Sequence, residues 1–223
     1  MDIESPHGPI ESWKDFFIHL CIITLGLLIA LGLEAMVAHV HERNLVREAN
    51  ANITAEMRDN QKNLEGSLQS VAKNHHEMES ILDYLEQMKQ DVNAHGSATI
   101  SFALADLNTT SWKTAAATGA LGFMTYRNVK RDEDVYDLQQ EFAVSQHRAV
   151  DSWATVYASF MQLIGHSQES VSGKKVRPTE AEVAQINATE EKVQLYIGRL
   201  IVVEQTGKGL DRSYTEYLNH SKK

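Results

Sequence analysis

The chain has 223 residues, of which 43% are hydrophobic and 23% charged, so a wholly disordered protein is excluded. Its formal net charge of −9 argues against a nucleic-acid binder, because binding through phosphate contacts needs a basic surface. The single cysteine, Cys21, excludes an internal disulfide and a cysteine-rich metal site.

The first predicted element is a membrane-spanning helix over residues 13–40. No charged residue occurs from Phe16 to Leu33, a run of eighteen residues, and at about 1.5 Å per residue such a run approaches the hydrocarbon thickness of a bilayer. Trp13 and Lys14 precede it and are predicted membrane-interface anchors, since an amphipathic ring and a flexible amine suit the headgroup region. A cleaved signal peptide is disfavoured by the acidic start, and a soluble core helix by the lack of a polar face.

The orientation of the span is indicated by the charges on either side of it. Lys14 is the only lysine or arginine before the span, whereas Arg43, Arg47 and Arg58 follow it. This asymmetry favours a cytoplasmic C-terminal body, but long domains also translocate despite flanking charge, so both orientations stay open. We expect a single-pass protein of the cell membrane, with the lipid bilayer as a partner.

One face of the predicted span carries small residues. Gly26, Ala30, Glu34 and Ala38 follow one another at steps of four, so they share one stripe of the helix. Because small residues let helix backbones approach closely, this stripe is a candidate helix-association face for self-association or for a membrane protein partner. The alternative is that glycine and alanine are simply common in spanning helices.

Glu34 allows two interpretations. An ionisable residue inside a membrane is a functional candidate, here as part of a proton or ion path. Alternatively, Glu34 comes directly after the uncharged run and marks the membrane interface, where a carboxylate costs little.

The span is predicted to continue as one long helix that ends at Gly96. The apolar pattern is poor and asparagine is frequent over residues 41–63, which we expect to form a solvated helical stalk; the tail before the span covers residues 1–12. Residues 64–223 are predicted to form a helical bundle. The apolar seam of its first helix consists of Leu64, Leu68, Val71, Met78, Leu82, Leu85, Met88 and Val92, with His75 filling a gap.

Further helices are predicted along the rest of the chain. A short piece at 100–107 precedes a helix from Trp112 to about Tyr126, and a longer helix covers Asp132–His166. The clearest loop is Gln168–Pro178.

The last helix begins at a capping box in which Thr179 is the N-cap and Glu182 the third helical residue. Gly207 and Gly209 are expected to bend or break it. No segment alternates apolar and polar residues in the manner of a strand. The fold class is therefore all-α: one N-terminal transmembrane helix that continues into a long stalk helix and an antiparallel helical bundle.

Residue patterns for catalysis are weak. His75, His76 and Glu79 are close enough along a helix to supply metal ligands, which leaves a metal-dependent enzyme as one hypothesis. There is no HExxH motif, no phosphate-binding loop and no nucleophile elbow. We expect a non-enzymatic protein with no catalytic, cofactor-binding or metal-binding residue.

Two stretches resemble those of uncharacterised bacterial single-span membrane proteins, in which a "GxLIALGxE" span end leads into a helical body. The first stretch matches at Gly26, Leu28, Ile29, Ala30, Leu31, Gly32, Glu34, His41, Arg43, Arg47, Glu48, Glu56 and Asn60. The second is SWKTAAATGAL, residues Ser111–Leu121. The resemblance implies a bacterial envelope protein, in the inner membrane, and brings no activity or cofactor.

The sequence therefore predicts a membrane-anchored helical scaffold, sensor or subunit of a larger membrane assembly. The alternative is an accessory subunit of an ion- or proton-coupled membrane complex in which Glu34 carries charge.

Overall fold

The computed structural model of the protein describes residues 13–92, 94, 101, 104–167 and 176–221. Three long helices dominate it: α1 (Trp13–Met88), α3 (Tyr126–Ser167) and α4 (Glu180–His220). A short helix α2 (Thr110–Ala117) and a 3₁₀ helix η1 (Ala120–Phe123) precede α3. No strand occurs among the described residues, and the all-α prediction is confirmed. The predicted tail 1–12 and most of the predicted loop 168–178 lie outside the described residues. Helix α1 ends at Met88, earlier than the predicted end at Gly96, because the chain leaves the helix through turns over residues 89–92.

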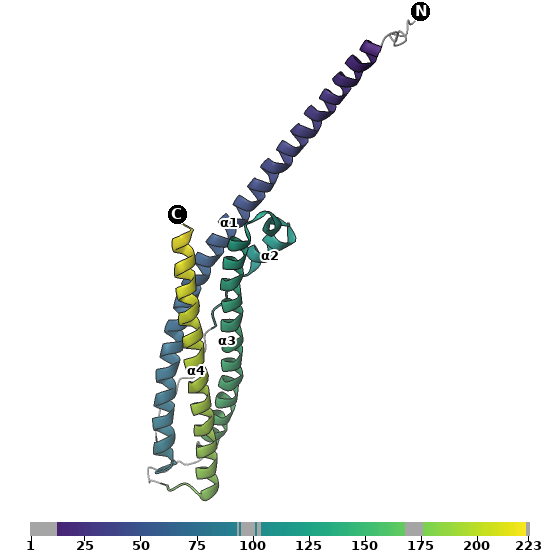
Figure 1. Ribbon diagram of the computed structural model, residues 1–223. Coiled ribbons are helices and arrows are strands. Elements are labelled where there is room, and N and C mark those ends of the chain that lie inside the picture. Colours follow the sequence, from purple (N-terminus) through teal and green to yellow (C-terminus); the bar gives the residue numbers. More distant parts are fainter. Residues whose placement is uncertain (1–12, 93, 95–100, 102–103, 168–175, 222–223) are drawn as a thin grey trace, which may run out of the picture.

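The C-terminal half of α1 forms an elongated bundle with α3 and α4, while its N-terminal half projects away from the bundle (Figure 1). Helix α4 packs against both α1 and α3 and runs antiparallel to them. The predicted antiparallel bundle is therefore confirmed. The short helices α2 and η1 lie at the end of the bundle from which the N-terminal half of α1 departs (Figure 1).

The bundle begins earlier along α1 than the sequence suggested. Ala49, Ile53, Met57 and Asn60 are buried, although they fall in the predicted solvated stalk 41–63. The prediction was wrong for this part because it treated asparagine as a mark of solvent exposure. Asn60 is buried and forms hydrogen bonds with the backbone of Asn108, in a non-helical segment beside α1. The packed bundle therefore extends back to Ala49.

The buried residues of α1 recur at alternating steps of three and four, as expected for a helix in a bundle. They are Ala49, Ile53, Met57, Asn60, Leu64, Ser67, Val71, Asn74, Met78, Ile81, Leu85 and Met88. The predicted seam was right about the leucine, valine and methionine positions that recur here. It wrongly gave His75 a place in the seam, which Asn74 occupies; Leu68 and Leu82 are only partly buried.

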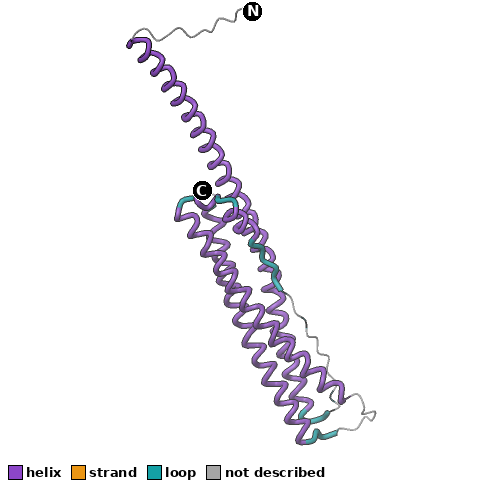
Figure 2. The backbone as a smooth tube through the Cα atoms, turned by 90° about the vertical axis from the view of Figure 1, so that its right-hand side faces the viewer, coloured by secondary structure: helices purple, strands orange, loops and turns teal. Residues whose placement is uncertain are grey.

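Three of the buried residues of α1, Asn60, Ser67 and Asn74, are polar. The reason is that a non-helical segment, rather than a helix, packs along one side of the bundle. Residues 104–109 run back along the bundle outside any helix (Figure 2), so the short piece predicted at 100–107 is not helical where it is described. The segment's free backbone N–H and C=O groups need hydrogen-bond partners. Side chains on α1 bond several of them: Asn63 donates to the Asp106 carbonyl, and Asn60 bonds both backbone groups of Asn108. The Ser101 hydroxyl also donates to the Asn74 side chain.

Asn60 is the central contact of this arrangement. Its side-chain oxygen accepts from the Asn108 N–H at 2.8 Å, and its amide donates to the Asn108 carbonyl at 2.7 Å. Gln139 of α3 donates to the same carbonyl at 2.9 Å and accepts from Tyr214 of α4 at 2.8 Å. The Asn60 amide also donates to the side-chain oxygen of Gln139 at 3.2 Å. Asn60 thus links α1 to the returning segment 104–109, and through Gln139 to α3 and α4.

We expect Asn60→Ala to destabilise the bundle by about 1–3 kcal/mol, because it removes two backbone partners and leaves Gln139 underbonded. Asn63→Ala is the matched control, since its single bond to Asp106 is exposed and 3.3 Å long. It should cost at most about 0.5 kcal/mol. Denaturant unfolding of the full chain in a mild detergent, followed by circular dichroism, measures both. Equal losses in the two variants would contradict the central role of Asn60.

The connection between α2 and α3 turns at Gly119. Its φ of 76° lies in the left-handed region, which favours glycine, and its N–H bonds the Ala116 carbonyl at 3.2 Å. The continuous helix predicted from Trp112 to about Tyr126 is therefore wrong: it breaks into α2 and η1. The next helix, α3, begins at Tyr126, earlier than the predicted Asp132.

The predicted capping box at the start of α4 is confirmed. The Thr179 hydroxyl accepts from the Glu182 N–H at 3.3 Å, and the Glu182 carboxylate accepts from the Thr179 N–H at 2.7 Å. Helix α4 then runs without a break to His220, so the expected interruption at Gly207 and Gly209 does not occur.

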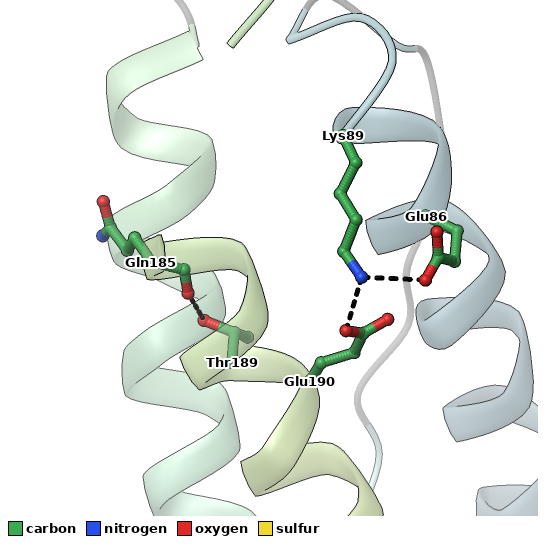
Figure 3. A network of polar contacts seen from close by, with 5 residues as sticks. All are labelled: Glu86, Lys89, Gln185, Thr189 and Glu190. Atoms are coloured by element: carbon green, nitrogen blue, oxygen red, sulfur yellow. Dashed lines mark hydrogen bonds and ion pairs between the residues drawn. The ribbon is translucent and has the colours of Figure 1, made fainter. Parts of the chain in front are cut away.

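At the end of the bundle far from the projecting helix, Lys89 ties α1 to α4. Its Nζ donates to Glu86 at 2.8 Å and to Glu190 at 2.7 Å (Figure 3). The hydrogen bonds to Glu190 and Glu86 raise the pKa of Lys89. Both partners belong to helices that already pack together, and this ion-pair group therefore fastens the end of the bundle.

Candidate functional site

The projecting half of α1 is the most unusual surface of the molecule. Every residue from 13 to 40 is exposed, and its bulky apolar side chains point to all sides of the helix. They are Trp13, Phe16, Phe17, Ile18, Leu20, Ile22, Ile23, Leu25, Leu27, Leu28, Ile29, Leu31, Leu33, Met36, Val37 and Val40. Among the described residues, α1 is the one helix long and apolar enough to cross a membrane.

Two polar side chains inside this apolar segment, those of Thr24 and His19, are bonded to the backbone of the helix itself. Thr24 donates to the Leu20 carbonyl at 2.7 Å, and the His19 ring contacts the Asp15 carbonyl at 2.7 Å. Hydrogen bonds within the segment suit an environment without water, where an unbonded polar group is costly.

The predicted helix-association face is exposed along its whole length. Gly26, Ala30, Glu34 and Ala38 lie on the projecting half of α1, and a Cβ at Gly26 would meet no other atom within 4 Å. The face is therefore open to a second helix, and its use in association stays a prediction. Of the predicted anchors, Trp13 is 78% exposed and packs edge-on against Phe16, next to Lys14.

The bundle end nearest this segment holds a cleft that the sequence did not reveal. Phe123 of η1 faces a row on α1, and together they line an open cleft. The α1 residues in this row are His39, Glu42, Arg43, Val46, Arg47 and Asn50. Just below it, α2 lies along residues 45–52 of the same helix. The cleft therefore begins where the exposed apolar surface of α1 ends, at Val40.

Buried contacts hold α2 and η1 in place. Glu56 of α1 accepts from the Ser111 N–H at 2.8 Å and from the Tyr136 hydroxyl at 2.6 Å. Trp112 stacks on Tyr136 with ring centroids 5.3 Å apart, and Ala120 of η1 is fully buried. Burial, together with the bond to Glu56, raises the pKa of Tyr136. These contacts fix η1, and with it Phe123, beside α1.

A buried carboxyl lies close to this region. Asp132 is fully buried, and its side chain accepts from Arg131 at 3.2 Å. Burial raises the pKa of Asp132 above its ordinary value of 3.8, and the charge of Arg131 opposes that change. The guanidinium of Arg131 also lies over the Tyr217 ring, 4.7 Å from its centroid, and burial raises the pKa of Tyr217 to about 12.

The raised pKa of Asp132 predicts a pH effect on stability. The folded state holds this proton more tightly than the unfolded state, so the contribution is complete below pH 3.8 and is lost as the pH rises through the folded value. Lowering the pH from 7 toward 4 should therefore stabilise the wild type relative to Asp132→Asn, by at most about 1.4 kcal/mol per pH unit. The exposed Asp134→Asn serves as control; a wild-type slope matched by Asp132→Asn would contradict the prediction. Denaturant unfolding at several pH values measures it.

The histidines proposed as metal ligands lie apart from this end. His76 is exposed, and its ring nitrogen is 3.4 Å from Glu79 on the surface of α1. No group of three or more histidine, cysteine or acidic residues that could hold a metal ion occurs within the described ranges.

A second groove, between α3 and α4, is lined by Val144, Arg148, Arg199 and Val202.

Comparison with protein-family models, curated proteins and solved structures gave no match.

Proposed function

We propose that this protein is a single-pass membrane protein whose helical bundle serves as a non-enzymatic scaffold, sensor or subunit of a larger membrane assembly. The observation that carries the proposal is the projecting half of α1, on which no residue from 13 to 40 is covered. In water, so large a continuous apolar surface would drive aggregation. A bilayer removes that cost, because the segment is long enough to cross it.

The bundle supports the non-enzymatic part of the proposal by how it uses its polar residues. Asn60, Gln139 and Glu56 bind backbone groups and other side chains of the bundle itself. Their hydrogen-bonding capacity therefore goes to holding the fold and positioning α2. The surfaces left for recognition are the association face of the span and the outside of the bundle.

Crosslinking in native membranes tests the proposed assembly. A short amine-reactive crosslinker applied to membranes that express the full chain should yield larger species, either a homo-oligomer or a complex with another membrane protein. Gly26→Leu with Ala30→Leu should reduce these species while leaving membrane insertion intact, because leucine keeps helix backbones apart. The matched control is Leu27→Ala with Leu31→Ala, one residue round the helix. Recovery of monomers alone from the wild type would overturn the assembly part of the proposal.

A further inference from the structure

The cleft beside Phe123 lies at a depth set by the spanning segment. The last exposed bulky apolar residue of that segment is Val40, and the α1 side of the cleft begins at His39 and continues past Arg47. From His39 to Arg47 the helix rises about 12 Å. The headgroup layer on one side of a bilayer is about 5–8 Å thick. If the apolar surface is in hydrocarbon, the upper part of the cleft therefore lies among the headgroups.

The charges in the cleft suit phosphate groups. Arg43 and Arg47 are one turn apart on the same side of α1, and both line the cleft. The carboxylate of Glu42 lies 3.9 Å from His39, while Arg47 donates to the neutral side chain of Asn44 at 3.0 Å. Guanidinium groups bind phosphate oxygens in pairs, which makes arginine well suited to a phospholipid headgroup.

The wall of the cleft opposite α1 presents an aromatic side chain, Phe123, which is 52% exposed. Tyr126 does not line this cleft; it follows shortly after η1 at the same end of the bundle and is 82% exposed. The backbone at both positions belongs to a packed element, because Ala120 of the same 3₁₀ helix is buried and Tyr126 is the first residue of α3. Aromatic rings are enriched at the level of the headgroups in membrane proteins. Arg127 follows directly and adds a further positive charge at this end.

We propose that this end of the bundle is a lipid-contact surface, in which Phe123 and Tyr126 enter the headgroup layer and Arg43 and Arg47 bind the phosphates of anionic phospholipids. The inference rests on the proposed membrane span, since it takes its depth from that segment. It gives the bundle a fixed tilt on the membrane, because α1 and η1 touch the same bilayer from two places. An acidic protein of net charge −9 is thereby held close to an anionic surface by a local basic patch.

Spin labels at three single cysteines separate this inference from the span itself. The native Cys21 reports on the span. Gly122→Cys, in a Cys21→Ser background, reports on η1, and Gly198→Cys in the same background is the control on α4. A Cβ at either glycine meets no other atom within 4 Å, so both variants should fold, which circular dichroism checks. The proteins are placed in nanodiscs of phosphatidylcholine alone or mixed with phosphatidylglycerol.

In the mixed nanodiscs, the label at residue 122 should lose collisions with a water-soluble nickel relaxation agent, whereas the label at residue 198 should keep them. Phosphatidylcholine alone, high salt, or Arg43→Gln with Arg47→Gln should weaken the protection at residue 122. Equal nickel access at residues 122 and 198, with Cys21 in hydrocarbon, would overturn the lipid contact alone. If the protection at residue 122 does not depend on lipid charge but increases with the number of chains per disc, a second copy of the chain covers this surface, and the lipid-contact proposal is also overturned. A water-exposed Cys21 label would overturn both proposals.

Discussion

Leu25→Asp combined with Leu28→Asp is expected to move the protein out of the membrane. Both leucines lie near the middle of the uncharged run and are about as exposed as its other residues. An aspartate at the centre of a span disfavours insertion by about 3 kcal/mol, so the pair should cost about 6 kcal/mol. Fractionation of cells, followed by an alkaline wash of the membranes, measures the change. The expected result is loss of the washed-membrane fraction together with aggregation or degradation of the chain.

The control adds the same two charges elsewhere. Leu195 and Val202 are exposed on α4, and Leu195→Asp with Val202→Asp should leave the protein in the washed membranes. A span variant that stays there as firmly as the control would contradict a lipid environment for residues 13–40.

Gly207→Leu is expected to produce the largest loss of bundle stability, about 3 kcal/mol. Gly207 is buried where α4 meets the other two long helices. A Cβ at this position would lie 2.6 Å from Leu68 Cδ2 of α1 and 3.0 Å from Phe142 Cε2 of α3. A leucine must therefore push the helices apart or displace both side chains, and a well-packed core resists either change. Denaturant unfolding of the full chain in detergent measures the loss.

Gly209→Leu is the matched control two residues later on the same helix. A Cβ there meets no other atom within 4 Å, and leucine is the better helix former, so this variant should be as stable as the wild type or more stable by up to about 1 kcal/mol. Leu68→Ala should recover part of the stability lost in Gly207→Leu, because it removes the nearer of the two obstacles. A Gly207→Leu variant as stable as Gly209→Leu would contradict the close packing.

The predictions that held depended on local chemistry. The capping box of Thr179 and Glu182 needs only neighbours within one helical turn, and it formed as expected. Leu64, Val71 and Met78 are buried because apolar residues at helical spacing must be covered by something.

The predictions that failed concerned polar residues and glycines. Asparagine is usually found at the surface, yet Asn60 is buried, because the backbone groups of Asn108 in the non-helical segment 104–109 need a hydrogen-bond partner at that point of the bundle. Gly207 was expected to bend or break the last helix, but it is instead the place where α4 packs closely against Leu68 of α1 and Phe142 of α3. Whether an asparagine or a glycine serves packing depends on residues that are distant in the sequence.

The candidate site divides in the same way. An aromatic and basic stretch runs from Phe123 to Arg131, and it could have suggested a membrane surface. Nothing in the sequence, however, places Phe123 beside Arg43, about eighty residues earlier.

The sequence by itself determined the apolar helix, the helical class and the cap of α4, because each follows from residue types within a few turns of one helix. Only the tertiary structure decided where the bundle begins, which polar side chains are buried and which groups meet at the cleft. Those features depend on the returning segment and on the turn at Gly119, which bring together parts of the chain that local preferences cannot connect.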